Sequence, residues 1–185
     1  MHQTTLISTI IVLVLLVGTF MKLKGGGVNS EELGGAASYL VGKPAPELQE
    51  GFWINSSPKK ISDYRGKVVL LEFWTYGCYN CRNTIPTINV WQKKYAGKEF
   101  VIVGVHTPEF DREKKLSNVR KEIEKLQIGY AVVTDNNYKT WKSYHQEYWP
   151  TIYLIDKKGI IRDINIGEGN YDKTEQLIKL LIAES

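Results

Sequence analysis

The strongest hydrophobic pattern in the chain is a pair of predominantly apolar runs, at residues 68–75, where Glu72 is the one charged residue, and at residues 100–107. Runs of this length that are rich in valine and isoleucine are typical of strands buried on both faces of a parallel sheet. Between them, residues 78–95 are predicted to form a helix that contains Pro86 and kinks there. Strand, helix and strand in this order predict an α/β domain.

The second half of the domain continues the alternation of helix and strand. The predicted elements are a helix over 111–127, a strand over 130–134, an aromatic-rich helix over 137–147, strands over 151–156 and 160–166, and a closing helix over 172–184. A Lys-Lys-Gly sequence at 157–159 favours a hairpin between the last two strands. Earlier, residues 52–55 and 60–61 are predicted to form a short hairpin around 56–58.

An uncharged apolar segment precedes the domain at residues 6–21. As a helix it would span about 24 Å, and its uncharged neighbours bring it close to the roughly 30 Å hydrocarbon core of a bilayer. A secretory signal peptide is the alternative, but no small-residue cleavage site follows the run closely. We predict an uncleaved membrane anchor over 1–24, a flexible linker over 25–42 and the folded domain over 43–185.

The orientation of this anchor is not determined by charge. Lys22 and Lys24 follow the apolar run, and by the positive-inside rule they would leave the domain in the cytoplasm. That bias consists of two charges only, and the chemistry described next favours the opposite side.

Composition excludes some classes of function. The 43% hydrophobic and 24% charged fractions are those of a globular protein. Against 20 acidic residues there are 24 basic ones, for a net charge of +4. No dense basic cluster interleaved with aromatic residues occurs, so we expect no nucleic-acid partner. Two cysteines cannot form a disulfide scaffold, although a single redox-active pair can operate in an oxidising compartment.

The two cysteines, Cys78 and Cys81, stand where the first predicted strand turns into a helix. The thiolate is the reactive form of cysteine, and the unpaired N–H groups and positive dipole end of a helix N-terminus stabilise an anion there. We therefore predict dithiol–disulfide exchange. Cys78 would attack a partner disulfide and Cys81 would resolve the mixed disulfide.

Alternatives to this exchange remain open. A zinc site would need two more ligands, and the domain offers only His106 and His145, at spacings that match no common site. The pair could also be a structural disulfide or inert. A thiol peroxidase is favoured by Thr75 three residues before Cys78, but Leu71 stands where such enzymes usually carry a proline. A non-catalytic binding module is a further possibility.

Glu72 is the second informative residue, because an ionised carboxylate inside a buried strand is costly without a partner or a role. It could lie beneath the cysteines and accept the proton of Cys81 during resolution, with its pKa raised by burial. The alternative is a carboxylate that reaches solvent at a sheet edge or pairs with a lysine.

The other histidines and aromatic residues carry weaker signals. His106 is expected to be a core or strand-end histidine, or to line the site. Trp141, Tyr144, His145 and Tyr148 are expected to pack a helix rather than form a binding face.

Most of residues 43–185 resembles the thioredoxin fold in its membrane-tethered TlpA/ResA branch. The matching pieces are KVVLLEFW before the C-x-x-C pair, Pro86 within the helix, and WPTIYLID near the end. FWTYGCYNC, GVHTPEF and the closing GEGNY resemble more closely the thioredoxin-like domain of DipZ-type proteins. The resemblance implies a three-layer α/β domain with a mixed central sheet, preceded by a single N-terminal membrane helix.

The resemblance also implies roles for single residues. Cys78 takes the nucleophile position, Cys81 the resolving position and Glu72 that of the buried acid. Pro150 takes the position of the family's cis-proline, which faces the disulfide while the preceding residue, Trp149, pairs with substrate. Three more residues are expected to contact substrate: Trp74, Tyr79 and Asn80.

Four positions depart from the family pattern. Tyr79 and Asn80 replace the Gly-Pro of thioredoxin, so its redox potential cannot be carried over. Gly77 stands where many relatives have tryptophan. Thr84 replaces a glutamate of ResA-like proteins, which weakens an assignment to cytochrome c maturation.

We therefore expect a thiol–disulfide oxidoreductase that works outside the cytoplasm, at the cell membrane, as a single-pass protein. The expected partners are protein disulfides and a membrane thiol electron transporter of the DsbD/CcdA type, both implied by the resemblance. The remaining alternatives are a redoxin-like peroxidase and a cytochrome c maturation reductase. We expect no cofactor and no metal.

Overall fold

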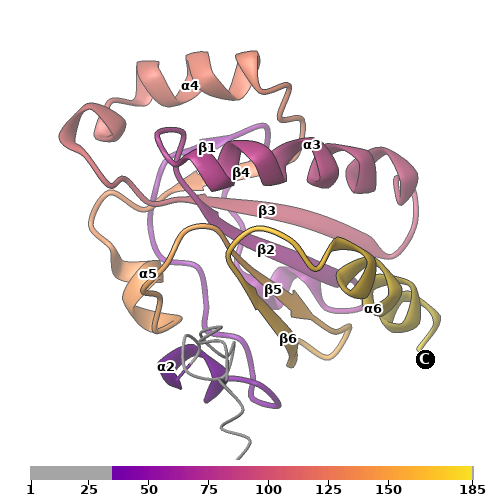
Figure 1. Ribbon diagram of the computed structural model, residues 1–185. Helices are drawn as coiled ribbons and strands as arrows, with labels where there is room; N and C mark the ends of the chain where they lie inside the picture. The colour runs from indigo at the N-terminus through magenta and orange to yellow at the C-terminus, as the bar shows by residue number, and fades with distance from the viewer. Residues whose placement is uncertain (1–34, 185) are drawn as a thin grey trace, which may run out of the picture.

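A mixed six-stranded sheet with the order β1-β4-β3-β2-β5-β6 forms the centre of the domain. The computed structural model describes residues 35–184 (Figure 1). The strands are β1 (Trp53–Ile54), β2 (Val68–Trp74), β3 (Phe100–His106), β4 (Ala131–Thr134), β5 (Thr151–Ile155) and β6 (Ile161–Ile166). Strands β2, β3 and β4 are parallel, and β1, β5 and β6 each run antiparallel to a neighbour. The sheet is mixed, as predicted.

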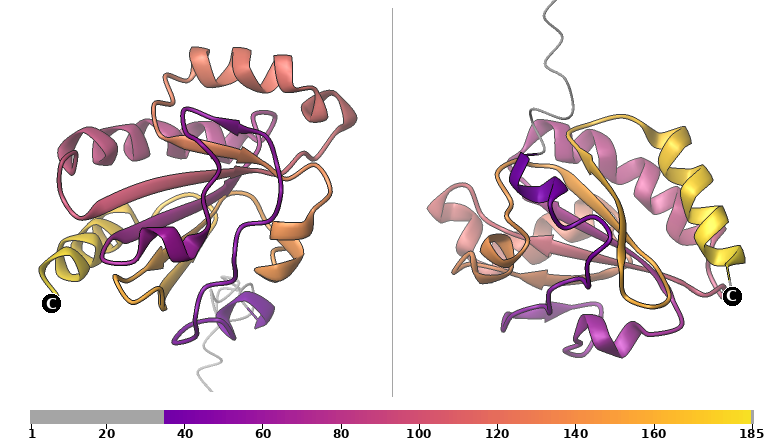
Figure 2. Two further views of the ribbon diagram at one scale, coloured as in Figure 1. Left: turned by 180° about the vertical axis from the view of Figure 1, so that it is seen from behind. Right: turned by 90° about the horizontal axis from the view of Figure 1, so that it is seen from below.

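Helices cover both faces of this sheet (Figure 2). One hydrophobic cluster contains side chains of α3 (Tyr79–Lys94), α4 (Leu116–Lys125) and α6 (Tyr171–Ala183). The other contains side chains of α2 (Gly35–Ser38) and α5 (Lys139–Ser143). The sheet with a helical layer on each face makes the three layers that the sequence predicts.

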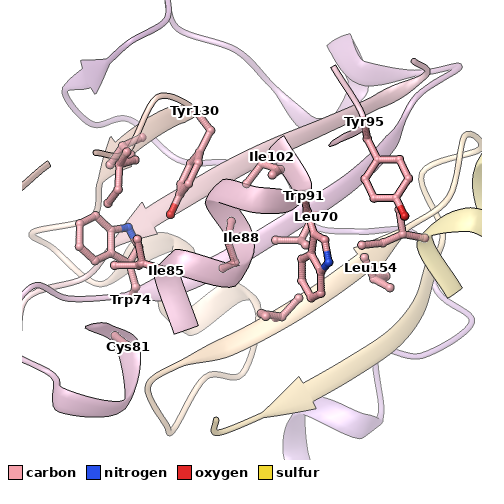
Figure 3. Close-up of a cluster of buried hydrophobic side chains, with 14 of the residues drawn as sticks. Leu70, Trp74, Cys81, Ile85, Ile88, Trp91, Tyr95, Ile102, Tyr130 and Leu154 are labelled. Atoms are coloured by element: carbon pink, nitrogen blue, oxygen red, sulfur yellow. The ribbon is translucent and has the colours of Figure 1, made fainter. Parts of the chain in front are cut away.

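Strand β2 is the central strand, and all seven of its residues are buried. Its alternate side chains belong to different clusters, with Leu70 and Trp74 on the α3 side and Phe73 on the α5 side. Figure 3 shows Leu70 and Trp74 together with Ile85 and Ile88 of α3. Because both faces of β2 are packed, the turn that follows it starts from a rigid base.

The predicted hairpin of residues 52–55 and 60–61 is wrong. Strand β1 pairs instead with β4, and residues Ile61–Tyr64 form a 3-10 helix. Asn55 explains the pairing, since its side-chain amide donates to the carbonyls of Ile128 and Tyr130 at 2.9 and 3.1 Å. The two carbonyls that Asn55 binds lie 73 and 75 positions further along the sequence, so no local pattern indicates this pairing.

Two predicted helices are shorter than their patterns suggest. The helix expected over 111–127 is divided into a 3-10 helix at Asp111–Lys114 and α4, because Lys115 adopts extended backbone angles. The helix expected over 137–147 is limited to α5, which begins after Tyr138, a residue in the left-handed region with φ of 57°. The division before α4 brings Glu113 to the site described below.

The N-terminal predictions are only partly within the described residues. The proposed anchor at 1–24 lies outside them, and within 35–184 no helix is long and apolar enough to cross a membrane. Inside the range predicted as a linker, Ala37 and Leu40 are buried, and the Gly42 N–H donates to the Ile161 carbonyl at 2.8 Å. This segment therefore packs against β6.

Candidate active site

Cys78 forms the N-cap of α3, directly after the turn that leaves β2. Its sulfur accepts a hydrogen bond from the Cys81 backbone N–H at 3.2 Å, and its own N–H donates to the Thr75 carbonyl at 3.2 Å. Both cysteines are free thiols. The sulfur of Cys78 thus takes the place that a serine or aspartate oxygen occupies in an ordinary helix cap.

This position makes Cys78 the more acidic thiol. Hydrogen bonds from the Cys81 thiol and from the Cys81 and Asn80 backbone N–H groups lower the pKa of Cys78 to about 7. Partial burial and the nearby Glu109 carboxylate act in the opposite direction. A thiol with this pKa is substantially ionised at neutral pH, which is the state needed for nucleophilic attack.

Cys81 has the opposite properties. Its side chain is fully buried in the α3 cluster, and desolvation, together with the neighbouring Cys78, raises its pKa well above that of an ordinary thiol. An acidic exposed thiol followed by a protonated buried one is the arrangement expected of an attacking and a resolving cysteine.

Glu72 is completely buried on the same face of the sheet as Cys81 and does not reach solvent. The Tyr130 hydroxyl donates to its Oε2 at 3.0 Å, while its Oε1 has no hydrogen-bond partner. Burial raises the pKa of Glu72 to about 8, and the Tyr130 hydrogen bond limits the rise. The charge of Glu72 contributes to the raised pKa of Cys81, and the charge of Cys81 contributes to the raised pKa of Tyr130.

Pro150 lies beside the end of β2, because Thr151 pairs with Phe73 across the antiparallel β2–β5 ladder. The Trp149–Pro150 peptide bond is cis, as the resemblance implies. The Trp149 indole stacks on Trp141 at 4.2 Å between ring centroids and donates its N–H to the Thr107 carbonyl at 3.1 Å. The residue before the proline is therefore held in place by two contacts.

The other predicted substrate contacts divide by exposure. Tyr79, with 76% of its surface exposed, and Asn80 lie in the first turn of α3 and are open to a partner. Trp74 is fully buried and packs edge-on against His106. Its burial does not fit the predicted contact with substrate, because its ring does not reach the surface.

The sequence did not point to Glu113 or Tyr130. Glu113 is fully buried, and its Oε2 accepts a hydrogen bond from the Thr75 hydroxyl at 2.6 Å. It stands in the sequence DREKK, which is typical of a solvated surface, so no local signal marked it. His106 is buried in the core, and its Nε2 lies 3.3 Å from the Thr75 hydroxyl oxygen. It therefore contacts the site from the interior of the protein.

Of the residues predicted to pack a helix, Trp141 and Tyr144 lie in the core cluster of the α5 face, as predicted, whereas Tyr148 is 41% exposed. His145 is exposed and in the left-handed region, with φ of 51°. Within residues 35–184, no three His, Cys, Asp or Glu residues are grouped so that they could hold a metal ion.

Comparisons with known proteins fit this site. The AhpC/TSA family model matches residues 41–164. Protein DipZ of Mycobacterium tuberculosis is 40% identical over 172 residues, covering 87% of this chain and 25% of DipZ. Thiol-disulfide oxidoreductase YkuV of Bacillus subtilis is 24% identical over 144 residues, covering 77% of this chain and 97% of YkuV. A thiol-disulfide isomerase structure from Corynebacterium glutamicum superposes with a TM-score of 0.69 and 26% identity, covering 76% and 98% of the two chains.

Fold and site together place the chain in the thioredoxin-like class of proteins, whose relatives and structural neighbours here include thiol–disulfide oxidoreductases. The chain belongs to the AhpC/TSA family. It spans about a quarter of the length of the DipZ proteins that it matches.

The acidity of Cys78 predicts how the reduced protein reacts with iodoacetamide. Alkylation of Cys78 should rise with pH to half its maximal rate near pH 7, because its pKa is about 7 and only the thiolate reacts. Cys81 should stay unmodified in the folded protein. Mass spectrometry of quenched samples measures both, with Cys78→Ser as the control. A midpoint near 8.5, the value of a free thiol, would contradict the assignment.

Proposed function

We propose that the chain reduces protein disulfides through the Cys78/Cys81 dithiol. The Cys78 thiolate attacks one sulfur of a partner disulfide, forming a mixed disulfide and releasing the first partner thiolate. Cys81 then loses its proton and attacks the Cys78 sulfur, which releases the second partner thiolate. The partner gains two electrons, and the dithiol becomes a disulfide.

The observation that carries this proposal is the contrast between the two thiols. Cys78 is partly exposed and acidic at the start of α3, whereas Cys81 is buried and holds its proton. Resolution therefore needs a base near Cys81, and the nearby carboxylate of Glu72, with a pKa of about 8, suits that role. Its Oε1 has no hydrogen-bond partner among the described residues and is therefore free to take up a proton.

Peroxidase chemistry is the second candidate, and the position of Thr75 argues against it. A peroxidatic cysteine benefits from a donor that stabilises the departing oxygen. The Thr75 hydroxyl, which the T-x-x-C pattern would supply, donates its one proton to Glu113 instead. A Cys81→Ser variant that consumes hydroperoxide would favour the peroxidase.

The compartment and partners are part of the proposal. We infer that residues 1–24 anchor the domain at the outer face of the cell membrane and that a DsbD/CcdA-type transporter supplies its electrons. The resemblance to DipZ-type proteins and the 40% identity to DipZ support this view. A role in cytochrome c maturation is the alternative, and one structural neighbour is described as a putative DsbE from Chlorobium tepidum.

Replacement of the resolving cysteine should trap the partners. In cells that produce Cys81→Ser, partner proteins should accumulate on Cys78 as mixed disulfides that run as higher-mass bands and disappear on reduction. Cys78→Ser is the matched control and should trap none. The trapped proteins, identified by mass spectrometry, report substrate and compartment together. Absence of any Cys78-linked species would contradict the exchange mechanism.

Replacement of the buried acid should slow the second chemical step only. With an aromatic disulfide such as dithiobis(nitrobenzoate), the first thiol released reports attack by Cys78 and the second reports resolution by Cys81. Glu72→Gln should slow the second release about a hundredfold, the lower range for general-base catalysis, and change the first much less. Equal slowing of both releases, or of neither, would contradict the role of Glu72.

The pH dependence of the second release gives an independent check. In the wild type it should increase through about pH 8 as Glu72 ionises. Tyr130→Phe removes the hydrogen bond that lowers this pKa, so the midpoint should move upward. Tyr144→Phe, which loses a partly buried hydrogen bond to the Pro46 carbonyl on the other face of the sheet, is the matched control and should leave the midpoint unchanged.

A further inference from the structure

Glu113 is a second buried carboxylate near the dithiol, and the exchange cycle does not use it. Its side chain is fully buried. Besides the Thr75 hydroxyl at 2.6 Å, its Oε2 accepts the backbone N–H groups of Glu109 at 2.8 Å and Phe110 at 3.3 Å. One carboxylate oxygen therefore joins the turn after β2 to the loop after β3.

Thr75 connects this carboxylate to the cysteines. Its hydroxyl proton goes to Glu113, so the same oxygen accepts from His106 Nε2, 3.3 Å away. Burial lowers the pKa of His106 to about 4, so the ring is neutral at neutral pH, and the hydrogen bond to the Thr75 oxygen places its one proton on Nε2. The Thr75 carbonyl accepts a hydrogen bond from the Cys78 N–H. The Thr75 backbone N–H donates to the Cys81 sulfur, which lowers the pKa of Cys81. Fixing the Thr75 side chain thus fixes a peptide in contact with both cysteines.

The other oxygen of Glu113 explains why residue 77 is glycine. A Cβ added to Gly77 would lie 2.0 Å from Glu113 Oε1, far inside van der Waals contact. The φ of Gly77 is not in the left-handed region, so the backbone itself accepts alanine. Oε1 cannot withdraw without breaking the three hydrogen bonds of Oε2. The obstacle to a side chain is therefore the carboxylate.

We propose that Glu113 is a positioning residue for thiol exchange. It acts through Thr75 to hold the turn 75–77, so that the N–H groups at the start of α3 stay aimed at the Cys78 sulfur. Its Oε1 also occupies the space that a side chain at residue 77 would need. The surface beside Cys78 is therefore not covered by a bulky side chain such as tryptophan. The proposal rests on the proposed role of Cys78 as the nucleophile.

The contact with Gly77 is tested by a double-mutant cycle on the full chain, with denaturant unfolding as the measurement. Gly77→Ala should lower the folding equilibrium constant by about tenfold or more in the wild-type background, because a buried charged hydrogen-bond network must open. In the Glu113→Ala background the same change should cost less than about threefold. If Glu113→Ala does not fold, Glu113→Asp, which withdraws the carboxylate by one methylene, replaces it. Additive costs in the cycle would overturn this part of the proposal.

The positioning role is tested by the pH profile of Cys78 alkylation in two Thr75 variants. Thr75→Val removes the hydroxyl and Thr75→Ser keeps it. Two charged groups act on Cys78: Glu109, from the loop before Asp111–Lys114, and Glu72, from β2. Neither substitution changes them. The midpoint should rise by about one unit in Thr75→Val and stay at the wild-type value in Thr75→Ser, because the loosened turn stabilises the thiolate less.

Tyr144→Phe again controls for lost stability. It removes a hydrogen bond on the other face of the sheet, so the alkylation profile of this variant should keep the wild-type midpoint. If Thr75→Val and Thr75→Ser have the same midpoint, Glu113 holds the loop without influencing the thiol, and the proposal is overturned. Both measurements use alkylation or unfolding, so they stand apart from disulfide reduction. A protein that passes them and fails to reduce disulfides would contradict the proposed function but not the contacts of Glu113.

Discussion

The hydrogen bond from the Cys81 backbone N–H to the Cys78 sulfur depends on where β2 ends and α3 begins. The sulfur can accept it only if Cys78 keeps extended backbone angles while the next residue is already helical. Strand β2 makes this possible because it is packed on both faces and paired on both edges. The low pKa of Cys78 follows from that geometry, the raised pKa of Cys81 follows chiefly from its burial, and the proposed order of attack follows from the difference.

Two buried carboxylates stand near this bond, and their surroundings give them different tasks. Glu72 has one partner, Tyr130, and an oxygen with none, so it is placed to take up a proton. Glu113 is bound through one oxygen by three donors from two segments, which suits a fixed support. In the proposed mechanism, the same side-chain chemistry serves proton transfer on the β2 side of Cys81 and positioning in the turn before Cys78.

Much of the fold follows from local pattern, whereas parts of the site do not. The apolar runs that became β2 and β3 carry their own signal, as does the cysteine pair at the strand–helix junction. The role of β1 could not be predicted, because Asn55 joins it to β4 across a long stretch of sequence. Glu113 has the sequence surroundings of a surface acid, but it lies in a separate 3-10 helix, where its side chain is buried and bound by three donors. Trp74 was expected to contact substrate by analogy, but the alternation of side chains along β2 directs it into the core.

The central claim is that the Cys78/Cys81 pair transfers electrons to protein disulfides. The most direct measurement is the reduction of insulin by dithiothreitol in the presence of the purified full-length chain, followed as precipitation of the released insulin chain. The account predicts catalytic acceleration over dithiothreitol alone, and its complete loss in Cys78→Ser. A rate equal to that of dithiothreitol alone, from a folded protein with both thiols free, would contradict it.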